Sequence, residues 1–372
     1  MKYYLISGEA SGDLHGANLM KSLKNLDAGA EFRVWGGDRM KNEGGVLVKH
    51  YRDLAFMGFI EVLFNLRTVL KNISFCKKDL LCHKPDVLIL IDYPGFNLRI
   101  AEFAHQQGIK VAYYISPQIW AWKKSRVHLI KRVVDRMMVI LPFESDFYKK
   151  YNFKVDFVGH PLLDAIHFEP VVDKKTFLSK HRLTDKPVIA LLPGSRKQEV
   201  SMMLSEMLKV IPFYPDHQFV IAGVGNFPDD AYASFTHDKN VTVVFDETHQ
   251  LLRTAQAALV TSGTATLETA LLGVPEVVCY KGNSLSYQIA RRVVDVKYIS
   301  LVNLIMDREV VKELIQGELN TQNLRKQLDL LLFDHAYRSK LKADYIELVS
   351  KLGSLGASDR AANLIVSMIK PG

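Results

Sequence analysis

Short apolar runs alternate with amphipathic stretches along most of the chain, and polar turns separate them. The run DVLILID at residues 86–92 is too continuously apolar for a half-exposed strand and is typical of a parallel sheet that is covered on both faces. The alternation of strand and helix predicts an α/β fold with parallel sheets. The runs that we interpret as strands cover residues 2–7, 31–37, 86–92, 110–116, 136–143, 187–192, 218–225, 241–246, 259–261 and 277–280.

One stretch, residues 259–280, combines a strand end, a polar turn and a helix start. Ser262, Gly263 and Thr264 form the predicted turn, residues 265–272 form the helix, and a new strand follows. The first backbone N–H groups of a helix have no partner within the helix, and together they carry a charge of about +0.5. The sequence therefore predicts that this turn can hold phosphate oxygens.

Glu268 lies one turn into that predicted helix. A glutamate that completes a capping box lies three positions after its Ser or Thr, whereas Glu268 comes four after Thr264 and six after Ser262. A carboxylate at this place can accept hydrogen bonds from ribose hydroxyls. The alternative is a glutamate that is merely favoured near the positive end of the helix dipole, and the local sequence leaves both interpretations open.

A second phosphate-binding turn is predicted in PVIALLPGSRKQEV, where an apolar strand ends in a Pro-Gly-Ser turn and a helix follows. Gly194 and Ser195 form the turn, and Arg196 comes directly after it. A guanidinium group can bind two phosphate oxygens at once, so this turn and its cation also suit a phosphate group.

The first strand leads into GEASGDLHG, which we expect to be a polar loop that opens the next helix. Its glycines have the spacing neither of a dinucleotide-binding fingerprint nor of a P-loop, so both of these nucleotide sites are unsupported. Glu9, Ser11, Asp13 and His15 follow the carboxyl end of a strand, where open α/β sheets bind ligands. For Glu9 and Ser11, a role in a site and an ordinary role in the loop and helix cap remain equally compatible with the sequence.

Asp92 ends the buried strand at residues 86–92 and directly precedes the turn YPGFN. A carboxylate at the end of a central strand is costly unless it has a partner or a function. We therefore predict a functional carboxylate at this position.

Residues 54–70 contain more large apolar side chains than a surface helix requires. One interpretation is an ordinary core helix. The other is an exposed apolar patch that contacts lipid or a partner, and the cations that follow it would suit a membrane surface. The residues that would contact lipid are Phe56, Met57, Phe59 and Phe64.

The charge composition favours anionic partners. The 48 Lys and Arg exceed the 40 Asp and Glu, which gives a net charge of +8 and favours phosphorylated ligands, acidic lipids or nucleic acid. Cations flanked by two tryptophans at residues 120–132 suit any of these, but no nucleic-acid-binding module is recognisable. The three cysteines form no CxxC pair, which indicates a reduced cytoplasmic protein and offers no metal-ligand spacing. No apolar run reaches the roughly 18 residues of a membrane-spanning helix, so membrane contact is expected to be peripheral.

The chain is longer than one hydrophobic core normally supports, so we expect two domains. Residues 167–186 are polar, contain Pro170 and lack apolar periodicity, which indicates a linker. An N-terminal domain at 1–166 and a C-terminal α/β domain at 187–335 follow from this boundary. The remaining residues, 336–372, are expected to form helices that can pack back on the N-terminal domain.

Eight strings occur in a characteristic order and span most of the chain: GEASGD, FMGFIEVL, IDYPGFN, SPQIWAW, FVGHPLLD, LLPGSR, SGTATLE and SLVNLI. In this order they resemble the lipid A disaccharide synthases, which are glycosyltransferases of the GT-B fold. One departure is Gly95, where some members of that family have a second aspartate, so this position supplies no carboxylate here.

The resemblance implies two Rossmann-like domains whose parallel sheets face a central cleft, with the sugar nucleotide bound by the C-terminal domain. It implies that 2,3-diacylglucosamine moves from UDP to the 6-hydroxyl of 2,3-diacylglucosamine 1-phosphate, which gives a β-1,6 disaccharide precursor of lipid A and UDP. The linkage changes from α to β, so the reaction inverts the anomeric carbon. The implied location is the cytoplasm, at the surface of the inner membrane.

Inversion requires a base for the acceptor hydroxyl and cationic or amide groups for the departing diphosphate. Asp92 is the expected base, with Glu9 and Ser11 beside it. The expected donor-binding residues are Gly194, Ser195, Arg196, Ser262, Gly263, Thr264, Glu268 and Asn303; Asn303 comes from the resemblance alone.

No Asp-x-Asp triplet of the kind that holds metal in GT-A enzymes occurs, so we expect neither metal nor cofactor. A UDP-sugar epimerase of the same fold is the alternative enzyme, and it would not need a lipid acceptor. A nucleic-acid-binding module would explain the basic charge but would leave Asp92 and Glu268 without a function.

Overall fold

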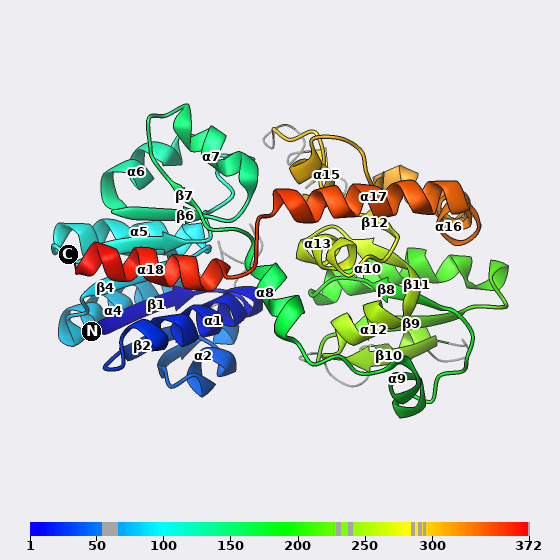
Figure 1. Ribbon diagram of the computed structural model, residues 1–372, viewed down its shortest axis with the longest axis horizontal. Helices are drawn as coiled ribbons and strands as arrows, with labels where there is room; N and C mark the ends of the chain where they lie inside the picture. Colours follow the sequence, from blue (N-terminus) through cyan, green and yellow to red (C-terminus); the bar gives the residue numbers. More distant parts are fainter. Residues whose placement is uncertain are drawn as a thin grey trace. The chain divides into compact units, whose positions relative to one another are not determined.

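The structure is a computed structural model, and it describes residues 1–53, 66–225, 227, 232–236, 241–283, 287–288, 292 and 295–370. Phe56, Met57, Phe59 and Phe64, the predicted lipid contacts, lie outside these described residues. The chain divides into two compact units (Figure 1). Unit 1 comprises Met1–Asp164 and Leu352–Gly372, and unit 2 comprises Ala165–Lys351.

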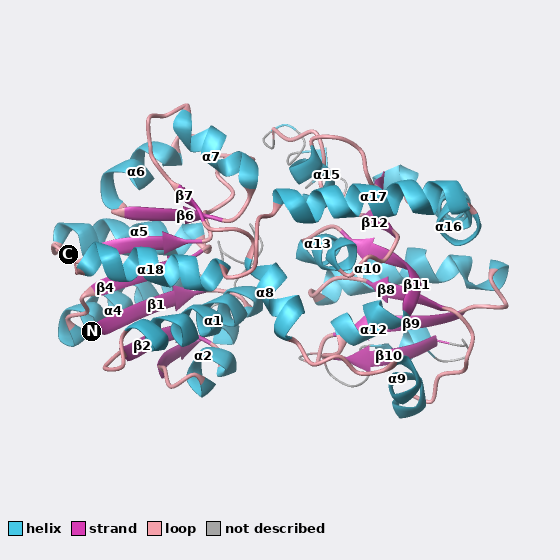
Figure 2. Cartoon of the chain, in the orientation of Figure 1, coloured by secondary structure: helices cyan, strands magenta, loops and turns pink. Residues whose placement is uncertain are grey.

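Unit 1 is built on a parallel sheet with helices packed against it (Figure 2). Its strands are β1 (Lys2–Ser7), β2 (Glu31–Gly36), β3 (Val46–His50), β4 (Val87–Ile91), β5 (Lys110–Tyr114), β6 (Arg136–Val139) and β7 (Asp156–Phe157). Their order across the sheet is β3-β2-β1-β4-β5-β6-β7. β4 is buried along its whole length, which explains its continuous apolar sequence.

The helices of unit 1 cover both faces of this sheet. They are α1 (Ala10–Leu26), α2 (Asp38–Asn42), η1 (Tyr51–Asp53), α4 (Leu66–His83), α5 (Pro94–Gln106), α6 (Arg126–Val133), α7 (Pro142–Lys149) and α18 (Ala357–Ile369). α18 lies beside α1, and α4 packs against α5 (Figure 1). One core cluster joins α4 and α5 to alternate residues of the strands, including Tyr4, Leu88 and Tyr113.

Unit 2 repeats this architecture with a second parallel sheet (Figure 2). Its strands are β8 (Val188–Leu192), β9 (Gln218–Gly223), β10 (Val241–Phe245), β11 (Ala255–Thr261), β12 (Glu276–Tyr280) and β13 (Lys312–Ile315), in the order β10-β9-β8-β11-β12-β13. Its helices are α9 (Lys174–Lys180), α10 (Lys197–Met207), η2 (Leu208–Phe213), α11 (Ala233–Thr236), α12 (Thr248–Thr254), α13 (Thr264–Leu271), α15 (Leu301–Met306), η4 (Gln316–Glu318), α16 (Thr321–Phe333) and α17 (His335–Lys351). α8 (Pro161–Phe168) carries the chain from unit 1 into unit 2.

The segment GEASGDLHG is not the loop that we predicted, because α1 already begins at Ala10. Its glycines allow the helix to lie close to its neighbours. A Cβ atom on Gly12 would lie 2.8 Å from the Cβ of Ser7, and one on Gly16 would lie 2.7 Å from the Sδ of Met40. Glycine is a poor helix former in isolation, so this packing role overrides its local preference.

Two assignments along the chain also change. Residues 167–186, which we predicted to be a linker, contain α9 and belong to unit 2, where Phe177 and Leu178 are buried. The C-terminal helices are divided between the units: α17 belongs to unit 2, whereas α18 belongs to unit 1 and packs against α1, as we expected of helices at this end of the chain. In the described part of the chain, no helix is both long enough and apolar enough to cross a bilayer.

Candidate functional sites at the two sheet switch points

Each sheet has one point at which the order of its strands reverses. In unit 1 this point lies between β1 and β4, and in unit 2 it lies between β8 and β11. Open α/β sheets bind ligands at the carboxyl ends of the strands that flank such a point. The predicted residues follow all four strands: Glu9 follows β1, Asp92 follows β4, Ser195 follows β8 and Ser262 follows β11.

The backbone of Asp92 is held in an unusual conformation. Asp92 and Tyr93 have φ angles of +44° and +50°, which is the left-handed region that non-glycine residues seldom adopt. The Asp92 carbonyl accepts hydrogen bonds from Asn97 Nδ2 at 2.7 Å and from Tyr113 Oη at 2.5 Å. Its N–H donates to the carbonyl of Ile115 at 3.2 Å. Residues in this region cost about 1–3 kcal/mol each, and such strain is concentrated at functional sites.

The electrostatic environment of Asp92 suits proton transfer. Burial of the carboxyl and, next, the charge of Glu9 raise its pKa to about 7, although a hydrogen bond with the backbone of Tyr93 opposes the rise. A general base is most effective when its pKa lies near the pH at which the enzyme works. The arrangement at the switch point of unit 1 can therefore accept a proton from a bound hydroxyl group.

The other polar residues after β1 divide into two kinds. Asp13 is buried and accepts hydrogen bonds from the backbone N–H groups of Gly37, Arg39 and Met40 at 2.7, 3.1 and 3.1 Å. This carboxylate therefore anchors the start of α2 and has a structural role. Glu9 and Ser11, by contrast, are exposed at the start of α1, and the Glu9 side chain does not cap the helix.

In unit 2, the turn after β8 is closed by a residue that we did not predict. The carboxylate of Glu199 accepts the N–H of Ser195 at 3.1 Å, and a Cβ atom on Gly194 would lie 2.2 Å from Glu199 Oε2. We expected the Ser195 N–H to point at a phosphate group, but in this structure its acceptor is the chain's own carboxylate. A capping-box glutamate accepts the N–H of the N-cap residue, whereas Glu199 reaches one residue further back, past the N-cap Arg196.

Arg196 is exposed at the N-cap of α10, beside the same turn. Its charge influences the pKa of Tyr280, which is the last residue of β12. Burial raises the pKa of Tyr280, Glu199 raises it further, and the Arg196 guanidinium opposes both effects. Arg196, Glu199 and Tyr280 therefore form one electrostatic cluster at the carboxyl edge of the sheet.

The turn after β11 is open to solvent. Gly263 and Thr264 are exposed, and a Cβ atom on Gly263 would have no described neighbour within 4 Å. Ser262 is held from both sides, because its N–H donates to the Cys279 carbonyl at 3.1 Å and its hydroxyl donates to the Ile299 carbonyl at 2.8 Å. The turn therefore presents the start of α13 to solvent, where unpaired helix N–H groups can bind an anion.

Glu268 has a partner that sequence reasoning missed. The Oε2 atom of Glu268 lies 3.8 Å from Nε2 of His249, which is on α12. The sequence signal was weak: a histidine in the first turn of a helix that follows strand β10. Only the packing of α12 against α13 brings the two side chains together.

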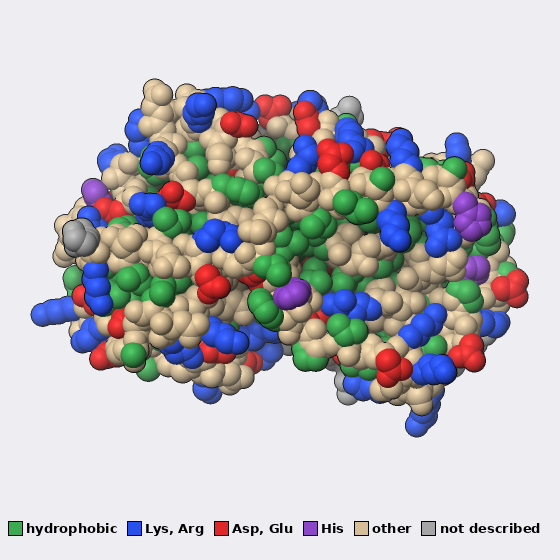
Figure 3. All heavy atoms as spheres, viewed as in Figure 1, with side chains coloured by type: hydrophobic (Ala, Val, Ile, Leu, Met, Phe, Trp, Pro, Cys, Tyr) green, Lys and Arg blue, Asp and Glu red, His purple; other side chains and the backbone are tan. Residues whose placement is uncertain are grey.

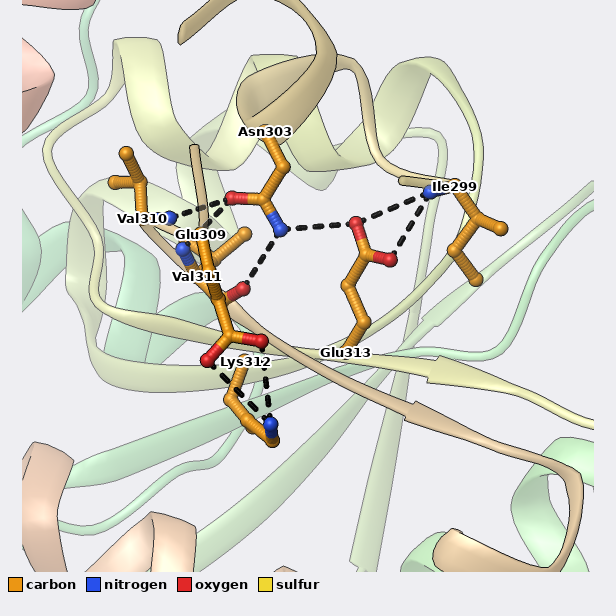
Figure 4. Close-up of polar contacts among 7 residues, drawn as sticks. All are labelled: Ile299, Asn303, Glu309, Val310, Val311, Lys312 and Glu313. Carbon is orange, nitrogen blue, oxygen red and sulfur yellow. Dashed lines mark hydrogen bonds and ion pairs between the residues drawn. The ribbon is translucent and has the colours of Figure 1, made fainter. Parts of the chain in front are cut away.

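Asn303 is fully buried, and both polar atoms of its side chain bond within the chain (Figure 4). Its Oδ1 accepts the N–H groups of Val310 and Val311 at 2.7 and 3.0 Å. Its Nδ2 donates to the Val311 carbonyl at 2.8 Å and to Glu313 at 2.9 Å. The side-chain amide therefore has no hydrogen-bonding group left for a ligand, and the assignment of Asn303 to the donor site, which came from the resemblance alone, stays a prediction.

The hydrogen bonds of Asn303 reach the turn after β11 indirectly, through Glu313 and Ile299. Glu313 also accepts the N–H of Ile299, with a shorter bond of 3.0 Å (Figure 4). It accepts the N–H of Ser300 at 2.9 Å as well. The carbonyl of Ile299 in turn accepts the hydroxyl of Ser262. Asn303 and Glu313 thus support the segment that holds the turn after β11.

The surface charge is mixed on the face that Figure 3 shows, where Lys and Arg side chains are scattered among Asp and Glu. In the basic and aromatic cluster of unit 1, Lys123 and Arg126 lie over the Trp122 ring, 4.5 and 5.5 Å from its centroid. These cations are thus paired with an aromatic face. Neither observation adds support for a nucleic-acid partner.

Comparison with known proteins identifies the family. A model of the lipid-A-disaccharide synthetase family matches residues 3–366. A lipid-A-disaccharide synthase of Trichlorobacter lovleyi is 39% identical over 98% of this chain and 97% of its own length. One of Syntrophus aciditrophicus is 40% identical with the same coverage.

Solved structures confirm the fold. The UDP-GlcNAc 2-epimerase of Neisseria meningitidis, solved with UDP-GlcNAc bound, has a TM-score of 0.66 at 14% identity and is matched over 100% of both chains. The glycosyltransferase of kitacinnamycin has a TM-score of 0.63 at 15% identity, over 100% of this chain and 99% of its own. The predicted GT-B fold is therefore confirmed. The chain is a glycosyltransferase that belongs to the lipid-A-disaccharide synthetase family.

Proposed function

We propose that this enzyme transfers 2,3-diacylglucosamine from UDP to the 6-hydroxyl of 2,3-diacylglucosamine 1-phosphate, with inversion at the anomeric carbon. The products are the β-1,6 disaccharide precursor of lipid A and UDP. One observation carries the proposal: each sheet offers half of the required chemistry at its switch point. Unit 1 has a carboxyl group of near-neutral pKa, and unit 2 has turns suited to phosphate and a carboxylate suited to ribose.

Asp92 is the base in this proposal. Its carboxylate takes the proton of the acceptor 6-hydroxyl as that oxygen attacks the anomeric carbon. The bond from this carbon to the diphosphate breaks at the same time, and the electron pair leaves with UDP. Burial and the charge of Glu9 keep the pKa of Asp92 high, and Ser11 in the first turn of α1 is a polar group for the acceptor.

The donor is assigned to unit 2. Arg196 and the N–H groups of the two turns, at Gly194 and Ser195 and at Gly263 and Thr264, neutralise the departing diphosphate. Since Ser195 is bonded to Glu199 in this structure, its amide becomes available only when that carboxylate turns away. Glu268 accepts the ribose hydroxyls, and Asn303 supports the turn after β11 through Glu313 and Ile299.

Both proposed substrates are amphiphiles, so we place the enzyme in the cytoplasm at the surface of the inner membrane.

Incubation with UDP-2,3-diacylglucosamine and 2,3-diacylglucosamine 1-phosphate, followed by mass spectrometry, tests the reaction directly. A disaccharide monophosphate and an equal amount of UDP are expected. Conversion of the sugar nucleotide without the acceptor would instead indicate an epimerase.

Turnover should persist in excess EDTA. The chain lacks an Asp-x-Asp triplet, and Arg196 with backbone N–H groups can stabilise the leaving diphosphate in the place of a metal ion. The measurement is the initial rate after dialysis against the chelator, before and after magnesium or manganese is added. A rate that collapses in EDTA and returns with either ion would contradict this prediction.

Replacing both Met57 and Phe59 with Ser should weaken binding to anionic vesicles even at high salt. Each buried CH₂ group of an acyl chain contributes roughly 0.8 kcal/mol, and salt screens the charge interactions but not this apolar contribution. Activity toward long-chain substrates should fall more than activity toward short-chain ones. Phe333→Ser is a matched control, because Phe333 is 61% exposed on unit 2. An unfolded double variant, with no vesicle binding by the wild type, would make this stretch part of the core.

A further inference from the structure

His249 lies between two carboxylates. Its Nδ1 is 2.7 Å from Glu169 Oε2, and its Nε2 is 3.8 Å from Glu268 Oε2. Burial by itself lowers the pKa of His249, but the nearby charges of Glu268 and Glu169 and the hydrogen bond with Glu169 outweigh it and raise the pKa overall. The ring is therefore suited to carry a positive charge and to bind a carboxylate on each side.

The position of His249 is fixed by the helix that carries it. α12 is fastened to the segment that precedes α9 by two further side chains. Gln250 accepts the N–H of Val172 at 3.1 Å and donates to the Pro170 carbonyl at 2.6 Å. Arg253 donates to the Ile166 carbonyl at 3.0 Å. With Glu169 on the same segment, these bonds hold α12 in place and aim His249 at Glu268.

Glu268 needs such a partner to hold its carboxylate in one orientation. It lies in the second turn of α13, next to the exposed turn at Gly263 and Thr264, and its side chain is 22% exposed. A glutamate side chain has three rotatable bonds, so an unheld carboxylate loses entropy when a ligand binds it. A carboxylate that is held by one oxygen is already oriented, and its other oxygen can accept hydrogen bonds.

We propose that His249 is a positioning residue for the donor: it holds one oxygen of Glu268 so that the carboxylate meets the ribose hydroxyls of the bound uridine diphosphate. This inference rests on the proposed function, which assigns the ribose to Glu268. His249 itself does not contact the donor. A purely structural ion pair is the competing explanation, and it predicts a loss that does not depend on the ribose.

The test compares UDP with 2′,3′-dideoxyuridine 5′-diphosphate, which lacks both ribose hydroxyls, by calorimetric titration. His249→Ala should weaken UDP binding about tenfold and dideoxy-UDP binding less than about twofold. His249→Gln should recover part of the loss, because its amide is a neutral donor that can reach toward Glu268 from the same position. In a Glu268→Ala background, His249→Ala should have less than about a twofold effect on UDP binding.

The chain offers a matched control in His181. This histidine is paired with Glu247 at 3.4 Å and is 15% exposed, as His249 is, but its partner is not Glu268. His181→Ala should leave both affinities within about twofold of the wild type. Thermal melts of every variant, with and without the ligand, separate a loss of folding from a loss of binding.

Equal weakening of UDP and dideoxy-UDP by His249→Ala would overturn the inference. A full effect of His249→Ala in the Glu268→Ala background would overturn it as well, because the histidine would then act by another route. Wild-type enzyme that binds UDP and dideoxy-UDP equally would remove the ribose role of Glu268. Wild-type enzyme that binds neither would contradict the proposed function itself, and the inference would fall with it.

Discussion

Asp92→Asn should lower kcat by about 10²- to 10⁴-fold and leave UDP binding unchanged, because asparagine preserves the shape of the side chain but cannot accept the acceptor proton. The fold should survive, since the bonds that hold this turn go to the backbone of residue 92. Asn97 and Tyr113 both donate to its carbonyl. The measurement is steady-state turnover at saturating substrates, with UDP affinity from calorimetry.

Asp86→Asn is the matched control. Asp86 lies just before the amino end of β4, is exposed, and accepts the backbone N–H of Lys2 at 2.7 Å. Its replacement should change kcat less than about twofold. Near-normal turnover of Asp92→Asn would make Asp92 a structural carboxylate, and Glu9 would then be the remaining candidate. Asp13 is no longer one, because three backbone N–H groups occupy it.

The pH profile supplies a second measurement on the same residue. Only the deprotonated form of Asp92 can accept a proton, and its pKa is raised to about 7, so kcat/KM should rise with pH and level off above an inflection near 7. The charge of Glu9 contributes to that rise, so Glu9→Gln should move the inflection to lower pH. An inflection near 4, the ordinary pKa of an aspartate, would place the base elsewhere.

Arg196→Ala should lower kcat/KM for the donor by roughly ten- to a hundredfold. A charge-assisted contact to a diphosphate contributes about 1.5–3 kcal/mol, and this is lost from the rate when the contact forms in the transition state. The guanidinium is exposed at the N-cap of α10, so its removal should not unfold the domain. Donor kinetics at a saturating acceptor concentration measure the effect.

Lys186→Ala is the matched control for this variant. Lys186 is an exposed cation just before the amino end of β8, where its Nζ donates to the Pro215 carbonyl at 2.8 Å. Lys186→Ala removes one positive charge from unit 2, as Arg196→Ala does, but at the opposite end of β8. If both variants lose activity equally, general electrostatic attraction explains the effect. If Arg196→Ala retains the wild-type kcat/KM, the diphosphate is bound by other groups.

The strands and the chemistry at their ends could be predicted from the sequence. Strands β1 and β4 are recognisable because burial on both faces requires a continuous apolar run, and this pattern is local. Asp92 and the turn at Ser262, Gly263 and Thr264 directly follow such runs. Their place at the carboxyl edge of a sheet could therefore be predicted from the apolar runs alone.

Local pattern was misleading where packing decides a residue's role. Gly12 and Gly16 indicated a loop, but they lie in α1, because a helix that lies close to a strand and its neighbours has no room for larger residues. Phe177 and Leu178 lie in a stretch too short and too polar to show a period, yet both are buried against the sheet of unit 2. A local pattern records which residues prefer a helix or a strand, and tertiary contacts can outweigh that preference.

The partners of the polar groups were decided only by the tertiary structure. Glu268 and His249 are 19 residues apart and lie on different helices, and Asn303 meets Glu313 across the gap between α15 and β13. A side chain with several donors and acceptors can bind a ligand or its own chain, and its sequence is the same in both cases. The sequence thus determined which chemical groups reach each sheet edge. The packing of α12 against α13, and of α15 beside β13, decided which groups bond to their own chain and hold their neighbours in place.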